Sequence, residues 1–170
     1  MNIKTREICI YGILGTLIFV LKIMMAPLPN IEPVSLLIII YTITFGAKSI
    51  YPIATYMLLE IIFYGFGFWS IGYLYVWLFL DVIVFAIYNM KHSTNVLLWA
   101  CVSGIYGLMF GALYIPLYLI SGGITMAISW WISGIYYDII HCVANFALCL
   151  ALFKPLTQLM FKLNKQYKIN

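Results

Sequence analysis

The stretch ICIYGILGTLIFVLKIMMAPLPNIEP, residues 8–33, decides the fold of this chain. Its first part, up to Ala26, is apolar apart from Lys22, and three prolines then end the run. A transmembrane helix needs roughly 20 mostly apolar residues, and proline stops a helix because it lacks the backbone N–H. The stretch therefore predicts a membrane span followed by a turn.

The rest of the chain repeats this alternation. Of its 170 residues, 65% are hydrophobic and only 8% are charged, and the mean hydropathy is +1.06. Too little polar surface remains to cover a soluble globule of this length. We expect an all-α polytopic membrane protein, a bundle of about six transmembrane helices forming one integral membrane domain, 1–170, with no room for a catalytic domain outside the bilayer.

Glycines, prolines and aromatic residues mark the predicted span boundaries. An outer loop rich in glycine and aromatics is expected over 65–72, a bend at Pro116, and a turn over 121–123 before the last span. The spans are expected over about 8–26, 34–47, 50–64, 73–90, 96–119 and 132–153, with a polar cytoplasmic tail over 154–170.

The basic residues orient these spans. Eight of the nine fall before the first span or in alternate loops after it, and only Lys22 departs from this pattern. Cytoplasmic loops retain Lys and Arg. We therefore expect a protein of the prokaryotic plasma membrane with both termini in the cytoplasm. The net charge of +4 then reflects topology and contact with anionic lipid rather than nucleic-acid binding. The eight residues are Lys4, Arg6, Lys48, Lys91, Lys154, Lys162, Lys165 and Lys168.

Ionisable and polar side chains inside a membrane are costly and mark functional sites. Glu32 lies in the first outer loop, Glu60 near the outer end of the third span, and Asp138 less than two turns into the last span. His141 and Asn145 follow Asp138 at offsets that place all three on one helical face. This convergence suggests a binding cavity that opens outward. Trp69 and Tyr73, in a glycine-bent aromatic cluster, would suit stacking on a flat heterocycle.

Other interpretations stay open. The same groups could form structural ion pairs, for instance Lys22 with Glu60 or Glu32, or Lys22 could extend to the outer interface. Asp81, near the middle of the fourth span, could join Glu60 and His141 in the relay of a stand-alone proton-coupled carrier.

An intramembrane enzyme would have only the Asp138-x-x-His141 pair, without HExxH or a Ser/Lys dyad, and we expect no enzyme. The four cysteines lie in apolar runs without CxxC, so no metal site is expected.

Small residues form two ridges that permit close helix approach. On the fifth span, Ala100, Gly104, Gly107 and Gly111 favour packing within the bundle. On the first span, a shorter ridge faces either the bundle or a partner, and we expect a partner helix. It consists of Gly12, Gly15 and Thr16.

Six spans in so short a chain, the proline-rich stretch 26–35 and the last-span pattern GIYYDIIH (134–141) leading to Asn145-Phe146 resemble the substrate-binding S components of energy-coupling factor (ECF) transporters. The resemblance implies a subunit that captures a vitamin or vitamin precursor outside the cell. It also implies docking to a transmembrane coupling subunit powered by two ATPases, so ATP is used by partners and no cofactor is expected in this chain. Family binding residues would correspond here to Glu32, Trp69, Tyr73, Asp138, His141 and Asn145, and the docking ridge to Gly12 and Thr16, with Gly15 beside them.

The excess of carboxylates over lysine disfavours a polyanionic ligand. A neutral or cationic heteroaromatic fits better, and pyrimidine precursors of thiamine, benzimidazole-type cobalamin precursors and other flat vitamins remain open.

Overall fold

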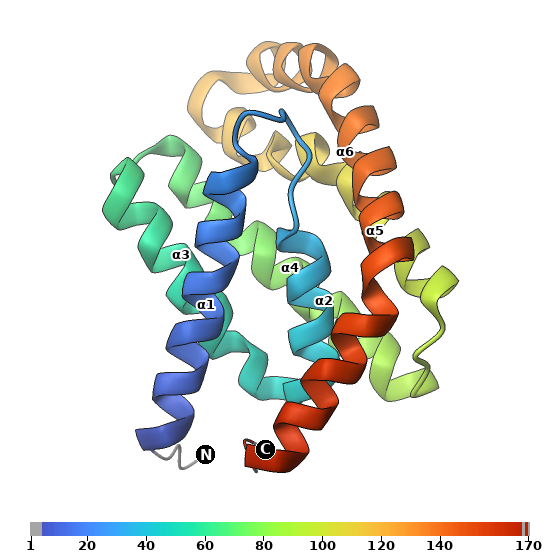
Figure 1. Ribbon diagram of the computed structural model, residues 1–170. Helices are drawn as coiled ribbons and strands as arrows, with labels where there is room; N and C mark the ends of the chain where they lie inside the picture. The colour runs from blue at the N-terminus through green and yellow to red at the C-terminus, as the bar shows by residue number, and fades with distance from the viewer. Residues whose placement is uncertain (1–4, 168, 170) are drawn as a thin grey trace.

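The computed structural model describes residues 5–167 and Ile169, and their regular structure is entirely helical, which confirms the all-α prediction (Figure 1). Helix α6 is interrupted at Gly123, whose φ of 75° belongs to the left-handed region that glycine adopts without strain. The elements are α1 (Thr5–Met25), α2 (Val34–Phe45), the 3-10 helix η1 (Gly46–Ser49), α3 (Ile50–Tyr64), α4 (Phe68–Lys91), α5 (Val96–Leu113) and α6 (Ile115–Tyr167).

Four segments of the described chain are long and apolar enough to cross a membrane. Two of them contain more than one helix, because 34–64 includes α2, η1 and α3, and 96–167 includes α5 and α6. Large apolar side chains such as Met24 and Ile62 are 70% and 72% exposed on the helix surfaces. Such surfaces are unfavourable in water over so large an area, so the molecule is consistent with a membrane protein.

Helix α2 is the centre of the bundle. All twelve of its residues are buried, and it packs against α1, α4, α5 and α6. Helix α1 packs mainly on α3, and α5 packs along α6. In Figure 1, α2 descends through the middle of the molecule while α1 and α3 cover one side and the long α6 covers the other.

The start of α1 and the end of α6 lie at the same end of the molecule (Figure 1). Arg6 donates a hydrogen bond to the carbonyl of Tyr167. At the same end, the Asn164 amide donates to the Thr44 carbonyl at 3.3 Å, and Lys48 pairs with Glu7 at 3.3 Å. The loop between α1 and α2 lies at the opposite end.

Three expected boundaries differ in the structure. Helix α4 begins at Phe68, so the loop expected over 65–72 is shorter, and its Gly67 N–H donates to the Ser70 hydroxyl at 2.8 Å. The span expected over 96–119 is interrupted at Tyr114, and Pro116 lies in the first turn of the next helix, α6, where proline fits. The expected tail over 154–170 is helical through Tyr167 despite Pro155.

The glycine ridge of α5 packs inside the bundle, as expected. A side chain added at Gly107 would meet the backbone of His141, and one at Gly104 would meet Phe146 and Cys142. The missing side chains therefore let α5 and α6 approach closely.

Candidate functional site

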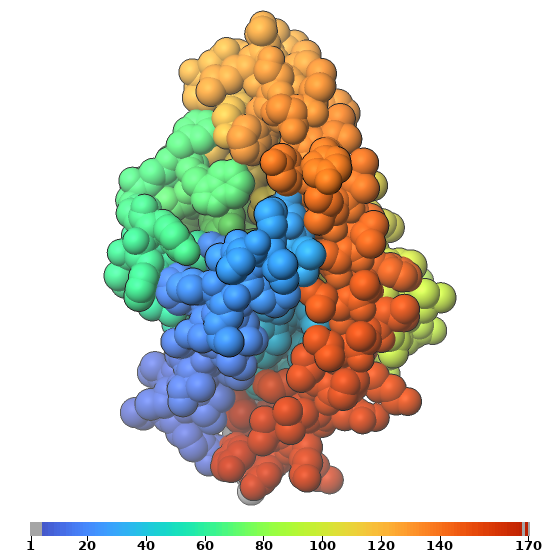
Figure 2. Space-filling model, turned by 45° about the horizontal axis from the view of Figure 1, so that its top comes forward, coloured from blue at the N-terminus to red at the C-terminus, as the bar shows by residue number. Residues whose placement is uncertain are grey.

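A cavity of about 560 Å³ lies at the end of the bundle opposite the start of α1 and the end of α6. Its walls come from the end of α1, the following loop, the end of α3, the start of α4, the end of α5 and the middle of α6. Figure 2 turns this end toward the viewer, where the blue loop, the green ends of α3 and α4 and the orange part of α6 meet. Its volume is ample for a small molecule.

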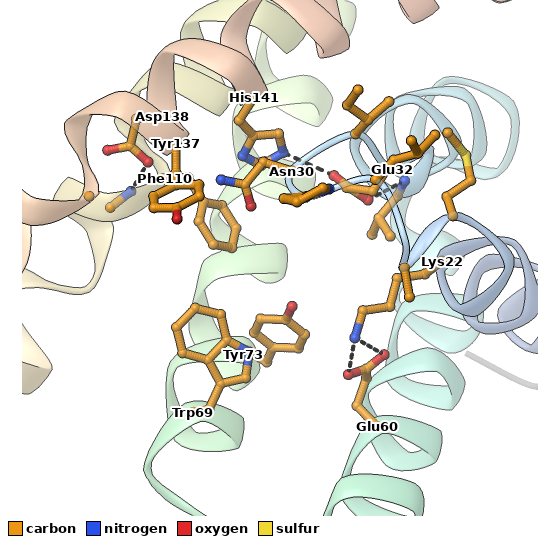
Figure 3. Close-up of a pocket in the computed structure, with 18 of the residues that line it drawn as sticks. Lys22, Asn30, Glu32, Glu60, Trp69, Tyr73, Phe110, Tyr137, Asp138 and His141 are labelled. Atoms are coloured by element: carbon orange, nitrogen blue, oxygen red, sulfur yellow. Dashed lines mark hydrogen bonds and ion pairs between the residues drawn. The ribbon is translucent and has the colours of Figure 1, made fainter.

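An ion pair closes one side of the cavity. Lys22 on α1 donates to both carboxylate oxygens of Glu60 on α3, at 2.8 and 2.7 Å (Figure 3). The ammonium also lies 4.7 Å from the ring centroid of Tyr64 and 5.5 Å from that of Tyr73. The sequence had left Lys22 either extended to the interface or paired, and the structure pairs it with Glu60. The two charges compensate each other.

Glu32 joins the first loop to α2 and α6. Its carboxylate accepts from the Val34 N–H at 2.6 Å and from the Ser35 hydroxyl at 3.2 Å, so it satisfies one backbone amide that the first turn of α2 leaves without a helical partner. It also lies 3.1 Å from Nε2 of His141 on α6. One side chain thus holds the cavity's loop to two helices.

Asp138 is only half satisfied. Its Oδ1 accepts from the Gly111 N–H on α5 at 3.0 Å, while its Oδ2 is buried without a hydrogen-bond partner among the described residues. A side chain at Gly111 would overlap this carboxylate, so glycine is what lets it approach the α5 backbone. Asp138 is 5% exposed and lines the cavity. A buried acceptor without a partner is costly and available to a ligand.

Aromatic rings form the remaining walls. The Trp69 ring lies 5.6 Å from that of Tyr73 and stacks on Tyr114 at 4.6 Å. Within the described part of the chain, two further polar atoms of the lining are buried without a hydrogen-bond partner. They are the Trp77 indole N–H and the Trp130 indole N–H. The cavity therefore offers flat apolar surfaces together with unused donors and one unused acceptor.

Six of the seven residues predicted to bind substrate line this cavity: Glu32, Glu60, Trp69, Tyr73, Asp138 and His141. The seventh, Asn145, does not line it. Its amide donates to the Ser35 hydroxyl at 3.1 Å and to the Ser103 carbonyl at 3.4 Å, so it ties α6 to α2 and α5. Its position on the same helical face as Asp138 is correct, but it lies about two turns farther along the helix.

Sequence reasoning missed several lining residues. Tyr56, Trp77 and Phe110 come from within apolar runs and carry no signal that separates them from packing residues. Trp130 also lies in a largely apolar run, and Gly111 was expected only as part of the packing ridge.

The three residues of the predicted docking ridge on α1 do not all lie on its outer face. Gly15 is buried against α3, where an added side chain would clash with Pro52 and Thr55. The expectation that Gly15 meets a partner is therefore wrong. Gly12 has open space around it, and the exposed Thr16 donates only to the Gly12 carbonyl at 2.9 Å. These two remain on the outer face.

No group of three or more His, Cys, Asp or Glu in the described residues is arranged to hold a metal ion. No family model, no curated protein and no solved structure matches this chain.

Proposed function

We propose that this chain is the substrate-capture S component of an ECF-type micronutrient importer. The observation that supports this best is the aromatic cavity at one end of the bundle, where buried polar atoms have no partner within the described chain. A flat ring could stack on Trp69 and Tyr73 while its polar edge satisfies Asp138.

In this proposal the chain crosses a prokaryotic plasma membrane six times, with both termini in the cytoplasm. The 3-10 helix η1 separates α2 from α3, and the helical backbone is interrupted at Gly123, so each of the two longest apolar segments could supply two crossings. The start of α1 and the end of α6, which carry Arg6 and Lys165, lie at the end opposite the cavity, and Lys48 pairs with Glu7 there. This agrees with cytoplasmic retention of basic residues. Lys4 and Lys168 lie outside the described residues. The cavity then faces outward.

The charge balance supports a neutral or cationic heteroaromatic ligand. Lys22 offsets Glu60, and His141 contacts Glu32, so within the described residues Asp138 is the cavity carboxylate that has no basic hydrogen-bond partner. A polyanion would meet this carboxylate unfavourably.

Transport would require a coupling subunit and two ATPases, which supply the ATP chemistry. The open surface at Gly12 and Thr16 is the place on α1 that could admit a partner helix. The chain itself is proposed to be no enzyme, because Asp138 bonds to Gly111 and His141 contacts Glu32, so the two do not pair as a catalytic couple.

The stand-alone carrier alternative has weaker support. Its relay needs Asp81 near the cavity, but Asp81 accepts from Thr42 and Ser49 and does not line the cavity.

The decisive experiment is mass spectrometry of small molecules released from the purified protein, followed by calorimetric titration of the molecule found. A flat vitamin-like compound that binds with one-to-one stoichiometry would support the proposed substrate capture. A lipid intermediate, or turnover of the bound compound by the isolated chain, would contradict it.

The topology has its own test in a cysteine-free background. A cysteine at Leu28 should react with an impermeant thiol reagent in intact cells, whereas one at Lys165 should not. The reverse pattern would overturn the orientation.

A further inference from the structure

A second cavity of about 380 Å³ lies near the basic end of the molecule. It lies between the loop that joins α4 to α5 and the last part of α6. Its lining includes Thr94 and Asn95 from the loop and Lys154, Thr157 and Phe161 from α6. The proposed transport function does not use this cavity.

The cavity is held open by specific contacts. The Trp99 indole N–H on α5 donates to the Ser93 carbonyl at 2.9 Å, which fixes the loop against its helix. The Trp99 ring also stacks on Phe153 of α6, with centroids 6.3 Å apart and planes 26° apart. The loop, α5 and α6 therefore form one supported wall around the space.

Thr157 differs from three other threonines that lie within helices, Thr42, Thr44 and Thr55. Thr42, Thr44 and Thr55 each donate to the carbonyl four residues earlier, at 2.7, 2.8 and 3.0 Å. This is the usual way a helical threonine satisfies its hydroxyl in an apolar setting. Thr157 is 3% exposed, lines the second cavity, and its hydroxyl has no partner among the described residues. Because a buried hydroxyl normally has a hydrogen-bond partner, the Thr157 hydroxyl is free to donate to an acceptor on a ligand.

The electrostatics favour an anion. Lys154 lines the cavity, and α5 begins at Val96 on its opposite wall, which places the positive end of that helix dipole at the space. Asn95 caps the Leu97 and Leu98 amides at 2.9 and 3.3 Å. Among the described lining residues, none is acidic.

We propose that this cavity binds the phosphate group of an anionic phospholipid. The phosphate oxygens would accept from the Thr157 hydroxyl and the Lys154 ammonium, while Phe161 and Val96 contact the glycerol and the upper acyl chains. These apolar walls favour a lipid over a soluble phosphate, and basic pockets between helices at a membrane surface are suited to lipid headgroups.

Native mass spectrometry of the detergent-purified protein tests the site. Phosphatidylglycerol, phosphatidylcholine and inorganic phosphate are titrated separately. We expect phosphatidylglycerol to bind with one dominant site and the other two to bind more weakly. Thr157→Val, which keeps the shape but removes the hydroxyl, should weaken phosphatidylglycerol binding roughly ten-fold. Lys154→Gln should weaken it about five-fold.

Two matched variants serve as controls. Thr55→Val removes a hydroxyl that already has a carbonyl partner, and Lys162→Gln removes the same charge from α6 outside the cavity lining. Both should bind phosphatidylglycerol as the unmodified protein does. An equal loss in Lys154→Gln and Lys162→Gln would show only diffuse attraction and overturn the site. Inorganic phosphate that competes at equal concentration would overturn the lipid assignment. If Thr157→Val has a lowered melting temperature, the comparison of Lys154→Gln with Lys162→Gln decides whether the site exists.

Discussion

Asp81 and Asp138 are both buried carboxylates within apolar helices, yet their surroundings differ. Asp81, 9% exposed, accepts at one oxygen from the Thr42 hydroxyl at 2.5 Å and the Ser49 hydroxyl at 2.7 Å, which ties α4 to α2 and η1. Asp138, 5% exposed, accepts from one backbone N–H, and its other oxygen lies at the cavity without a hydrogen-bond partner among the described residues. Burial alone therefore does not distinguish these two carboxylates, whereas their hydrogen-bond partners do.

The strongest test of this contrast is Asp138→Ala. Losing a hydrogen bond to a buried ligand donor costs about 1 to 3 kcal/mol, or roughly five- to more than a hundred-fold in affinity. Calorimetry with the copurified molecule measures this loss, and the melting temperature without ligand should change less. Unchanged affinity would remove Asp138 from the site.

Asp81→Ala should produce the opposite pattern. The Thr42 and Ser49 hydroxyls lose a charged acceptor and keep the backbone carbonyls of Ile38 and Gly46, each at 2.7 Å, so the free energy of unfolding should fall by about 1.5 kcal/mol. Melting curves in detergent report this loss, while the ligand dissociation constant of the folded fraction stays as in the unmodified protein. A weakened dissociation constant would instead connect Asp81 to the binding site and revive the carrier interpretation.

Gly111→Ala tests whether the position of the Asp138 carboxylate matters. The added methyl group would meet that carboxylate and push it from the Gly111 N–H. We expect about a ten-fold loss of affinity, near 1.4 kcal/mol. Gly12→Ala, where an added methyl group meets open space, is the control for a glycine replacement and should bind normally.

Asn145→Ala should have the smallest effect. Its amide joins three helices outside the cavity lining, and hydrogen bonds between helices in membranes contribute about 0.6 kcal/mol on average. A modest drop in melting temperature with unchanged affinity is expected. A large affinity loss would return Asn145 to the binding site where the sequence had placed it.

The sequence predicted part of the candidate site. Helical spacing correctly placed Asp138, His141 and Asn145 on one face of α6. The spacing does not show how far along the helix the cavity extends, so Asn145 lies outside its lining.

The pairing of Lys22 with Glu60 was among the expected alternatives because few charges were available. The contact between Glu32 and His141 joins residues 109 positions apart, and no local pattern carries that information. Gly12 and Gly15 likewise had the same expected role in the sequence, and only the packing of α3 against Gly15 distinguishes them.

The shortness of α2 has a consequence for the strength of binding in different buffers. Its twelve residues rise about 18 Å at 1.5 Å per residue, while the hydrocarbon core of a bilayer is about 30 Å thick. In the proposed orientation, the remaining depth above α2 is occupied by the cavity and by the loop that contains Glu32, and such irregular backbone is tolerated at membrane depth when protein surrounds it. A molecule held there is shielded from bulk ions, because salt screens buried charges much less than exposed ones. Its affinity should therefore vary little with ionic strength, even if the ligand carries a positive charge.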